Sequence, residues 1–276
     1  MNRSSKGTAL ITGASSGIGA IYADRLAVRG HDLILVARNR DRLDTMKTRI
    51  IKDTGRSVEV IVADLNDRAD LASVEKALRA DSSIAVLINN AGIGATQAFI
   101  ESDIGKMEKM IDLNITALVR LTYAVVPAFV QRGSGTIINI ASVVAIAPDV
   151  LNGVYGGTKA FVLAFSLSLD KELAASGIRI QAVLPGATAT NFWAVAGTPL
   201  EHVASNTVMQ ATDLVDAAIA GLDQGELVTI PSLTDITDWE EYEAARRNLL
   251  PKLSLSTPAA RYGVTRRPAA EVSIAK

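Results

Sequence analysis

The segment that decides the fold is residues 8–19, TALITGASSGIG. It begins with an apolar, β-branched run as long as a buried strand, and the helical periodicity of Ile18 to Val28 follows. Between them, Gly13 permits a tight turn, Gly17 lets the backbone approach a pyrophosphate, and Gly19 allows close helix packing. An ordinary strand-to-helix turn is the alternative. The order strand, glycine loop, helix favours binding of a dinucleotide at the helix amino terminus, with contacts from Gly13, Ser15, Ser16, Gly17, Ile18 and Gly19.

Short β-branched runs recur along the chain, with helical-length segments between most of them. This alternation predicts a parallel sheet covered by helices on both faces, because parallel neighbours need right-handed crossovers. We therefore expect a doubly wound, Rossmann-type α/β domain of about seven strands. The predicted strands are Thr8 to Thr12, Asp32 to Ala37, Ser57 to Ala63, Ile84 to Asn89, Thr136 to Ala141, Ile178 to Leu184 and Leu227 to Ile230.

One domain is predicted for residues 1–250, because no long linker and no repeat of fixed period divides them. It includes a stretch around 189–212 that is expected to fold over the substrate as a lid. Residues 251–276 differ, since basic side chains stand there among Ser, Pro and Gly with weak periodicity. They are either a flexible end or an arm on a neighbouring subunit.

Composition excludes several classes of function. The 28 basic and 29 acidic side chains nearly cancel, so binding of nucleic acid is not expected. Cysteine is absent and His31 and His202 are isolated, so no metal site is expected. The longest apolar tract, Ile115 to Val130, is interrupted by Arg120 and Pro127 and falls short of a membrane span. These observations favour a cytoplasmic enzyme without a membrane partner.

The second predicted strand ends at Ala37 and is followed by Arg38 rather than by a carboxylate. A carboxylate there would bind free ribose hydroxyls, whereas an arginine fits a 2′-phosphate. The sequence therefore favours NADP over NAD, with Arg40 as an additional contact. After the third strand, Asp64 and Leu65 are predicted cofactor contacts; Asp64 either pairs with the adenine amino group or caps the helix near Asn66.

Tyr155 and Lys159 stand four residues apart in the helical segment Tyr155 to Ala175, so they share one helix face. A free tyrosine has a pKa near about 10, and a neighbouring ammonium together with an oxidised nicotinamide favours the phenolate. Ser142 follows the strand Thr136 to Ala141, at the sheet edge where such folds bind ligands. Together these residues are suited to hold and protonate a carbonyl oxygen.

At this point the chain resembles the short-chain dehydrogenase/reductase family, over roughly Thr8 to Ile230. The matching motifs are the glycine loop at 12–19, Asn89-Asn90-Ala91-Gly92, Asn114, Ser142, Tyr155 with Lys159, and Pro185-Gly186 followed by Thr188 and Thr190.

The resemblance implies roles that the residues alone do not. Asn114 would complete a catalytic tetrad with Ser142, Tyr155 and Lys159, by holding a water in a proton relay to Lys159. Residues 89–92 would shape the floor of the cofactor site, with Asn90, Ala91 and Gly92 as contacts. Pro185, Gly186, Thr188 and Thr190 would surround the nicotinamide amide and the phosphates.

The implied reaction is a hydride transfer from NADPH to a ketone or aldehyde while Tyr155 donates a proton, which is the activity of a carbonyl reductase. The segments Ile104 to Val130 and Tyr155 to Leu173 are apolar on more than one face. A homodimer or homotetramer is therefore expected, and the resemblance points to the same helices.

Apolar side chains near the expected site favour a small apolar or aromatic substrate. They are Phe192, Trp193, Val195 and Met209 in the lid, and Val143, Val144 and Ile146 after Ser142. The same residues are equally compatible with a core or an interface.

Two rival functions remain open at this stage. A regulatory protein that senses NADP without turnover is compatible with the fold, but Ser142, Tyr155 and Lys159 disfavour it. An S-adenosylmethionine methyltransferase also uses a glycine loop, but it would favour an acidic ribose contact over Arg38.

Overall fold

The computed structural model describes residues 5–264. Within that part of the chain a seven-stranded parallel sheet runs in the order β3-β2-β1-β4-β5-β6-β9. The doubly wound Rossmann-type fold is thereby confirmed. The strands are β1 (Thr8–Thr12), β2 (Asp32–Ala37), β3 (Val58–Val62), β4 (Ile84–Asn89), β5 (Gly135–Ile140), β6 (Ile178–Val183) and β9 (Val228–Thr229).

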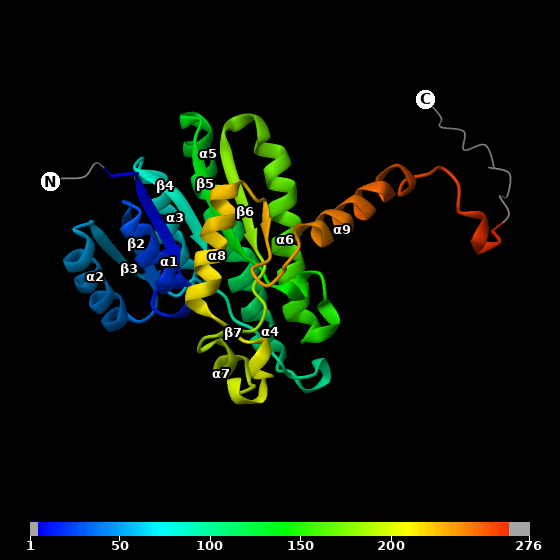
Figure 1. The fold of residues 1–276 in the computed structure, drawn as a ribbon, viewed down its shortest axis with the longest axis horizontal. Coiled ribbons are helices and arrows are strands. Elements are labelled where there is room, and N and C mark those ends of the chain that lie inside the picture. The colour runs from blue at the N-terminus through cyan, green and yellow to red at the C-terminus, as the bar shows by residue number, and fades with distance from the viewer. Residues whose placement is uncertain (1–4, 265–276) are drawn as a thin grey trace, which may run out of the picture. The chain divides into compact units, whose positions relative to one another are not determined.

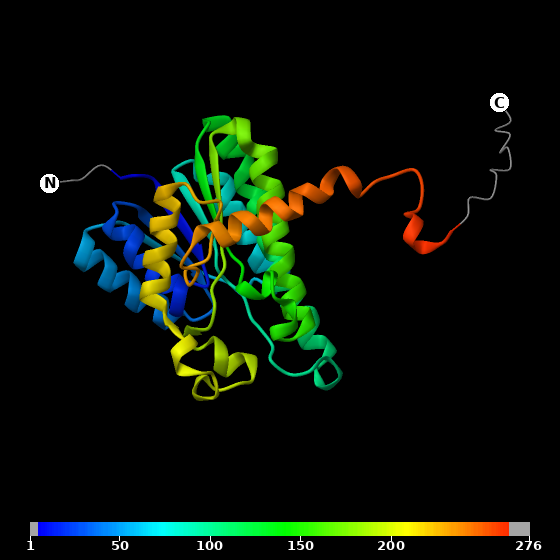
Figure 2. The same cartoon turned by 45° about the vertical axis from the view of Figure 1, so that its right-hand side comes forward.

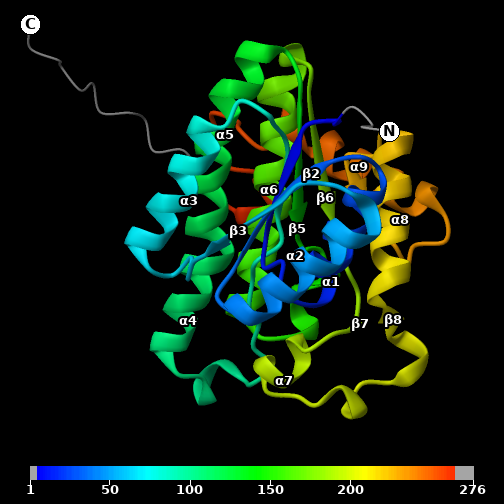
Figure 3. The same ribbon diagram turned by 90° about the vertical axis from the view of Figure 1, so that its left-hand side faces the viewer.

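Helices cover both faces of this sheet, as Figure 3 shows nearly edge-on. They are α1 (Gly17–Val28), α2 (Arg40–Thr54), α3 (Arg68–Ala80), α4 (Ile104–Ile111), α5 (Leu118–Arg132), α6 (Gly153–Leu173) and α8 (Ala211–Gln224). Side chains alternate between the faces along each strand, because successive residues of a strand point in opposite directions. In β1, Ala9 and Ile11 pack with α1, α2 and α8, whereas Leu10 packs with α3 and α5.

The strand order reverses between β1 and β4, which are both hydrogen-bonded neighbours in the middle of the sheet. From β1 the chain winds outward to β2 and β3, and it then returns to β4 and winds the other way. In open parallel sheets, ligands bind outside the carboxyl ends of the strands at such a point.

A separate two-stranded pair, β7 (Thr188–Ala189) and β8 (Met209–Gln210), encloses the short helix α7 (Phe192–Ala196). Figures 1 and 2 show this segment at one end of the sheet, at the same end as the loop that precedes α4. It coincides with the stretch that the sequence predicts to cover the substrate.

Helix α4 continues through a π-helical turn, Asp112–Ala117, into α5. Pro127 lies inside α5 and does not end it. By length and composition, Ile104–Arg132 is therefore long enough to cross a membrane, and 44% of its most apolar window is buried in the fold. The expectation that Arg120 and Pro127 shorten this tract was wrong. A core helix of a soluble protein has the same properties, and α5 contributes Leu121, Val125 and Phe129 to the core.

The described residues divide into two compact units, 5–232 and 233–264. The second contains α9 (Ile236–Leu249), in which Glu243 pairs with Arg246 and Trp239 stacks on Tyr242. The domain over residues 1–250 and the tail over 251–276 stay predictions from the sequence. The end of the predicted tail, from residue 265, lies outside the described residues.

Candidate active site

The glycine loop forms a cradle at the amino terminus of α1. Gly13 and Gly17 have φ angles of 65° and 55°, in the left-handed region that favours glycine. Ser16 precedes the first turn of α1 without making a side-chain capping bond, and that turn contains no acidic residue. The helix therefore presents uncapped N–H groups and its positive dipole end, a combination that fits a diphosphate.

A clamp of hydrogen bonds joins this loop to the end of β4. Thr12 Oγ1 accepts from the backbone N–H groups of Asn90 and Ala91, both at 3.0 Å. The Asn90 side chain donates to the carbonyl oxygens of Thr12 at 2.8 Å and Gly13 at 3.2 Å. A Cβ atom on Gly19 would lie 2.5 Å from Asn90 Nδ2. Gly19 is thus needed for packing behind the loop and does not line the cleft, although the sequence predicts a cofactor contact there.

Asn89 takes no part in this clamp. It is buried, and its side chain donates to Thr122 Oγ1 at 3.0 Å and to Asn139 Oδ1 at 2.9 Å. Asn89 therefore lies among core side chains rather than on the floor of the cofactor site.

Beyond β2, the cleft is lined by Arg38, Asn39 and Arg42. Asn39 caps α2 by accepting from the backbone N–H of Arg42 at 2.9 Å. Arg40, which the sequence offers as an additional contact, is the first residue of α2 and is not among the residues that line the cleft. Arg42, two residues further along the first turn of α2, does line the cleft.

Asp64 lies across from Arg38, with 3.8 Å between the carboxylate and the guanidinium. Its other carboxylate oxygen accepts from the backbone N–H of Asn66 at 3.0 Å, and the residue that caps α3 is Asp67. Asp64 and Leu65, which the sequence predicts as cofactor contacts, both line the cleft. Arg38 is 75% exposed, so its guanidinium is free to turn toward a phosphate.

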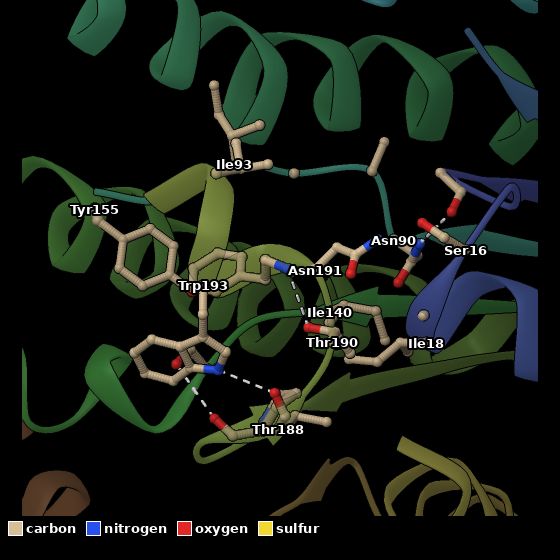
Figure 4. A pocket seen from close by; sticks show the side chains of 18 of the residues that line it. Ser16, Ile18, Asn90, Ile93, Ile140, Tyr155, Thr188, Thr190, Asn191 and Trp193 are labelled. Atoms are coloured by element: carbon tan, nitrogen blue, oxygen red, sulfur yellow. Dashed lines mark hydrogen bonds between the residues drawn. The ribbon is translucent and has the colours of Figure 1, made fainter. Parts of the chain in front are cut away.

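One large cleft, about 1790 Å³ in volume, connects this region to the predicted catalytic residues. Figure 4 shows Tyr155 at one end and Ser16, Ile18 and Asn90 at the other, with Thr188, Thr190 and Trp193 between them. This volume is large enough for a dinucleotide and a second, smaller molecule.

Ser142 and Tyr155 meet in the cleft, although they come from different elements. Ser142 follows β5 and Tyr155 lies in the first turn of α6, which Asn152 caps by accepting from the backbone N–H groups of Val154 and Tyr155. Burial raises the pKa of Tyr155 to about 12, and a hydrogen bond with Ser142 acts in the opposite direction. The phenol is therefore protonated at neutral pH, and the effect predicted for Lys159 together with an oxidised nicotinamide stays a prediction.

Lys159 is buried one turn beyond Tyr155 and donates to the Ile140 carbonyl oxygen at 2.8 Å. Its ammonium nitrogen is 5.9 Å from the centre of the Tyr155 ring. Burial lowers the pKa of Lys159 from 10.5 to about 8, because the charged form has lost its water. Tyr155 and Lys159 thus face the same compartment.

Asn114 lies behind the cleft rather than in it. Its side chain donates to the Ile93 carbonyl oxygen at 2.8 Å and to Thr158 Oγ1 at 3.0 Å, and it accepts from the Ile93 N–H at 3.0 Å. Asn114 belongs to the π-helical turn, an irregularity that is frequent at functional sites. In the structure this side chain fixes the position of the loop after Gly92, and the predicted water relay stays a prediction.

The segment after β6 forms the remaining wall. Pro185 accepts at its carbonyl oxygen from the Val143 N–H at 2.9 Å and from the Ser142 hydroxyl at 3.2 Å. The indole N–H of Trp193 donates to the Thr188 carbonyl oxygen at 2.9 Å. Pro185, Gly186, Thr188 and Thr190 all line the cleft.

Six of the seven apolar residues predicted near the substrate line the cleft; Ile146 does not. Trp193 is buried, and Phe192 lies 5.6 Å from the Tyr155 ring and 5.7 Å from the indole, measured between ring centres. Sequence reasoning missed Ile93, Val150 and Leu151 among the lining residues. The signal for Ile93 is its place directly after Gly92, whereas nothing local marks the other two.

Comparisons with known proteins agree on one family. The family model for short chain dehydrogenase matches residues 7–200. A short-chain dehydrogenase from Sphingobium yanoikuyae, solved in complex with NADPH, is 49% identical with a TM-score of 0.90, and the match covers 93% of this chain and 99% of that one.

Two further proteins extend the comparison. The bulky-bulky ketone specific alcohol dehydrogenase from Comamonas testosteroni is 45% identical with a TM-score of 0.86, over 94% of this chain and 99% of that one. The very-long-chain 3-oxoacyl-CoA reductase of Anas platyrhynchos is 35% identical over 74% of this chain. This chain spans 66% of the length of that relative.

Proposed function

Because this chain belongs to the short-chain dehydrogenase/reductase family and is an NAD(P)-dependent oxidoreductase, we propose that it reduces bulky apolar ketones with NADPH. The observation that carries the proposal is that the buried side chains of Ser142, Tyr155 and Lys159 line one cleft, which leads to the glycine loop. With an enzyme family established, the NADP-sensing alternative has no support.

Tyr155 supplies the proton in this reaction. Its phenol is neutral at neutral pH because its pKa is raised, so it donates from its oxygen to the oxygen of a bound carbonyl as negative charge develops there. Ser142 Oγ turns from the Pro185 carbonyl oxygen to donate a second hydrogen bond to the same substrate oxygen. Lys159 faces the phenol as a cation and stabilises the phenolate that forms.

NADPH supplies the hydride to the carbonyl carbon when it is bound. The uncapped amino terminus of α1 and the glycine loop fit its diphosphate. Arg38 and Arg42 fit the 2′-phosphate, because two guanidinium groups at this end of the cleft complement a dianion that NAD lacks. The 49% identical protein solved with NADPH supports this preference.

Apolar walls around Tyr155 support the choice of substrate. Val144, Leu151, Phe192, Trp193 and Val195 line this end of the cleft, and they would desolvate a highly charged metabolite without compensating it. The ketone specificity of the 45% identical Comamonas enzyme supports substrates with bulky groups on both sides of the carbonyl. We propose the same class for this chain.

The decisive experiment is Tyr155→Phe, which removes one hydroxyl group and keeps the ring. We expect ketone reduction, followed as NADPH oxidation, to fall by a factor of at least about 100, while NADPH binding measured by fluorescence persists. Tyr262→Phe is the matched control, since Tyr262 is 63% exposed and is not among the residues that line the cleft. Undiminished turnover in Tyr155→Phe would remove the proposed role of the phenol.

A further inference from the structure

We propose that the Phe192 ring, which packs directly against the backbone of Gly94, determines the specificity of the site among bulky ketones. The inference rests on the proposed function, because it assigns a specificity-determining pair to that same site. Phe192 belongs to α7, and Gly94 belongs to the loop between β4 and α4. The two residues are about 100 positions apart in the sequence, as are Thr96 and Ala196, which join the same two segments by a hydrogen bond.

The contact between Phe192 and Gly94 leaves no room for a side chain on the loop. A Cβ atom built on Gly94 would lie 2.6 Å from Cε2 of the Phe192 ring and closer still to its Cζ. Gly94 is not among the glycines with a positive φ in the described chain, so a left-handed backbone is not what excludes a side chain there. The aromatic ring is therefore the obstacle to a side chain at this position.

The same ring packs beside the proton donor. The centres of the Phe192 and Tyr155 rings are 5.6 Å apart, with the ring planes tilted by 45°. Phe192 also meets Trp193 edge-on, and the indole is tied to the Thr188 backbone. The wall that a substrate meets next to the phenol is thus built on the Phe192 ring.

Hydrogen bonds between the loop and α7 hold this arrangement in register. Thr96 donates twice to the Ala196 carbonyl oxygen, from its backbone N–H at 3.0 Å and from its hydroxyl at 2.9 Å. The Thr198 hydroxyl donates to Thr96 Oγ1 at 2.8 Å. These bonds hold the backbone on both sides of the contact in place, so the position of the ring depends on its own side-chain packing against Gly94 and Tyr155.

The test is a double-mutant cycle with Phe192→Ala, Gly94→Ala and the double variant. The substrates are acetophenone and butyrophenone, which differ only in the alkyl group on one side of the carbonyl. We expect Phe192→Ala to raise the ratio of kcat/KM for butyrophenone over acetophenone by about tenfold, because it removes the wall. Gly94→Ala should change this ratio in the parent chain by displacing the ring.

The double-mutant cycle shows whether Gly94 acts through its contact with Phe192 or whether the two residues affect specificity independently. In the Phe192→Ala background, Gly94→Ala should change the ratio by less than about twofold, because the ring that it displaces is gone. NADPH affinity should stay constant in all variants, and Phe99→Ala, an exposed phenylalanine on the same loop, serves as control. Equal effects of Gly94→Ala in both backgrounds, or an unchanged ratio in Phe192→Ala, would overturn the inference.

Failure of the proposed function gives a different result. If the parent chain oxidises NADPH with neither ketone nor any other carbonyl compound, the reductase assignment itself fails. If the parent reduces both ketones and the ratios do not respond as stated, only the role of Phe192 and Gly94 is lost.

Discussion

Arg38, Arg40 and Arg42 follow the same strand, but only Arg38 and Arg42 line the cleft. We expect Arg42→Ala and Arg38→Ala each to raise the Kd of NADPH by about tenfold, because each removes a charge-assisted contact to the 2′-phosphate in a partly hydrated setting. The Kd of NADH should stay the same. Fluorescence titration with both nucleotides measures this difference.

Arg40→Ala is the matched control for that pair of variants, since it removes the same charge from the same segment. Its Kd values should equal those of the parent chain. An equal loss of NADH and NADPH binding in Arg38→Ala or Arg42→Ala would show that these arginines hold the loop and not the phosphate.

Lys159 is a buried cation whose cost to stability depends on pH. Its pKa falls from 10.5 to about 8 on folding, so between these values the unfolded chain binds one more proton than the folded chain. The free energy of unfolding contributed by this group therefore rises with pH across that window. At pH 7 the charged form opposes folding by up to about 3 kcal/mol.

Lys159→Met removes this cost but leaves the Ile140 carbonyl oxygen without its donor, which offsets about 1 kcal/mol. We expect the variant to be about 1–2 kcal/mol more stable than the parent at pH 7, and the gap to close toward pH 10. Urea unfolding at both pH values measures the gap. A gap independent of pH would mean that folding leaves the pKa of Lys159 at its ordinary value. The variant should lose activity, because residues that are needed for catalysis often lower the stability of the folded protein.

The sequence could predict those site residues whose interaction partners lie within a few positions along the chain. Tyr155 and Lys159 share a helix face by their spacing, and Gly13 and Gly17 are set by one turn. Thr12 was not predicted as a functional residue, because its hydroxyl acts on Asn90 and Ala91, 78 and 79 positions away. No pattern along the chain encodes such a distance.

The clamp made by Asn90 joins two elements, the turn after β1 and the end of β4. Asn90→Ala removes both side-chain donors to the loop carbonyls, and we expect a loss of about 1–3 kcal/mol of unfolding free energy. The loosened loop should bind NADH and NADPH less well by the same factor, because the diphosphate is common to both. Melting without nucleotide and titration with each nucleotide measure the two effects.

Selective loss of NADPH binding in Asn90→Ala would contradict this account, since it would place Asn90 near the 2′-phosphate. The arginine variants above provide the opposite pattern, so the two sets act as controls for each other.

Among the elements, the seven strands were predicted to within one or two residues because each is a short apolar run between polar turns. The continuity of α4 into α5 was not, since Pro127 and Arg120 are ordinarily interruptions. Arg120 is accommodated at the surface by an ion pair with Glu75 of α3, a partner from another helix.

Among the exposed apolar side chains of the described residues are aromatic residues on α5 and α6. Tyr123 on α5 is 75% exposed, and Phe161 on α6 is 37% exposed and stacks on Phe165 at 5.9 Å between ring centres. Large exposed aromatic residues are characteristic of interfaces, where they bury much area at little entropic cost. We therefore propose a homo-oligomer that buries these faces of α5 and α6.

Sedimentation velocity at micromolar protein tests this assembly. The parent chain should sediment as a dimer or tetramer, and Tyr123→Glu and Phe161→Glu should each shift it toward the monomer, because burying an unpaired carboxylate costs several kcal/mol. Val28→Glu is the control, since Val28 is 73% exposed at the end of α1, outside the proposed interface. A monomeric parent would remove the proposal. An oligomer that persists in both glutamate variants would assign assembly to another surface of the molecule.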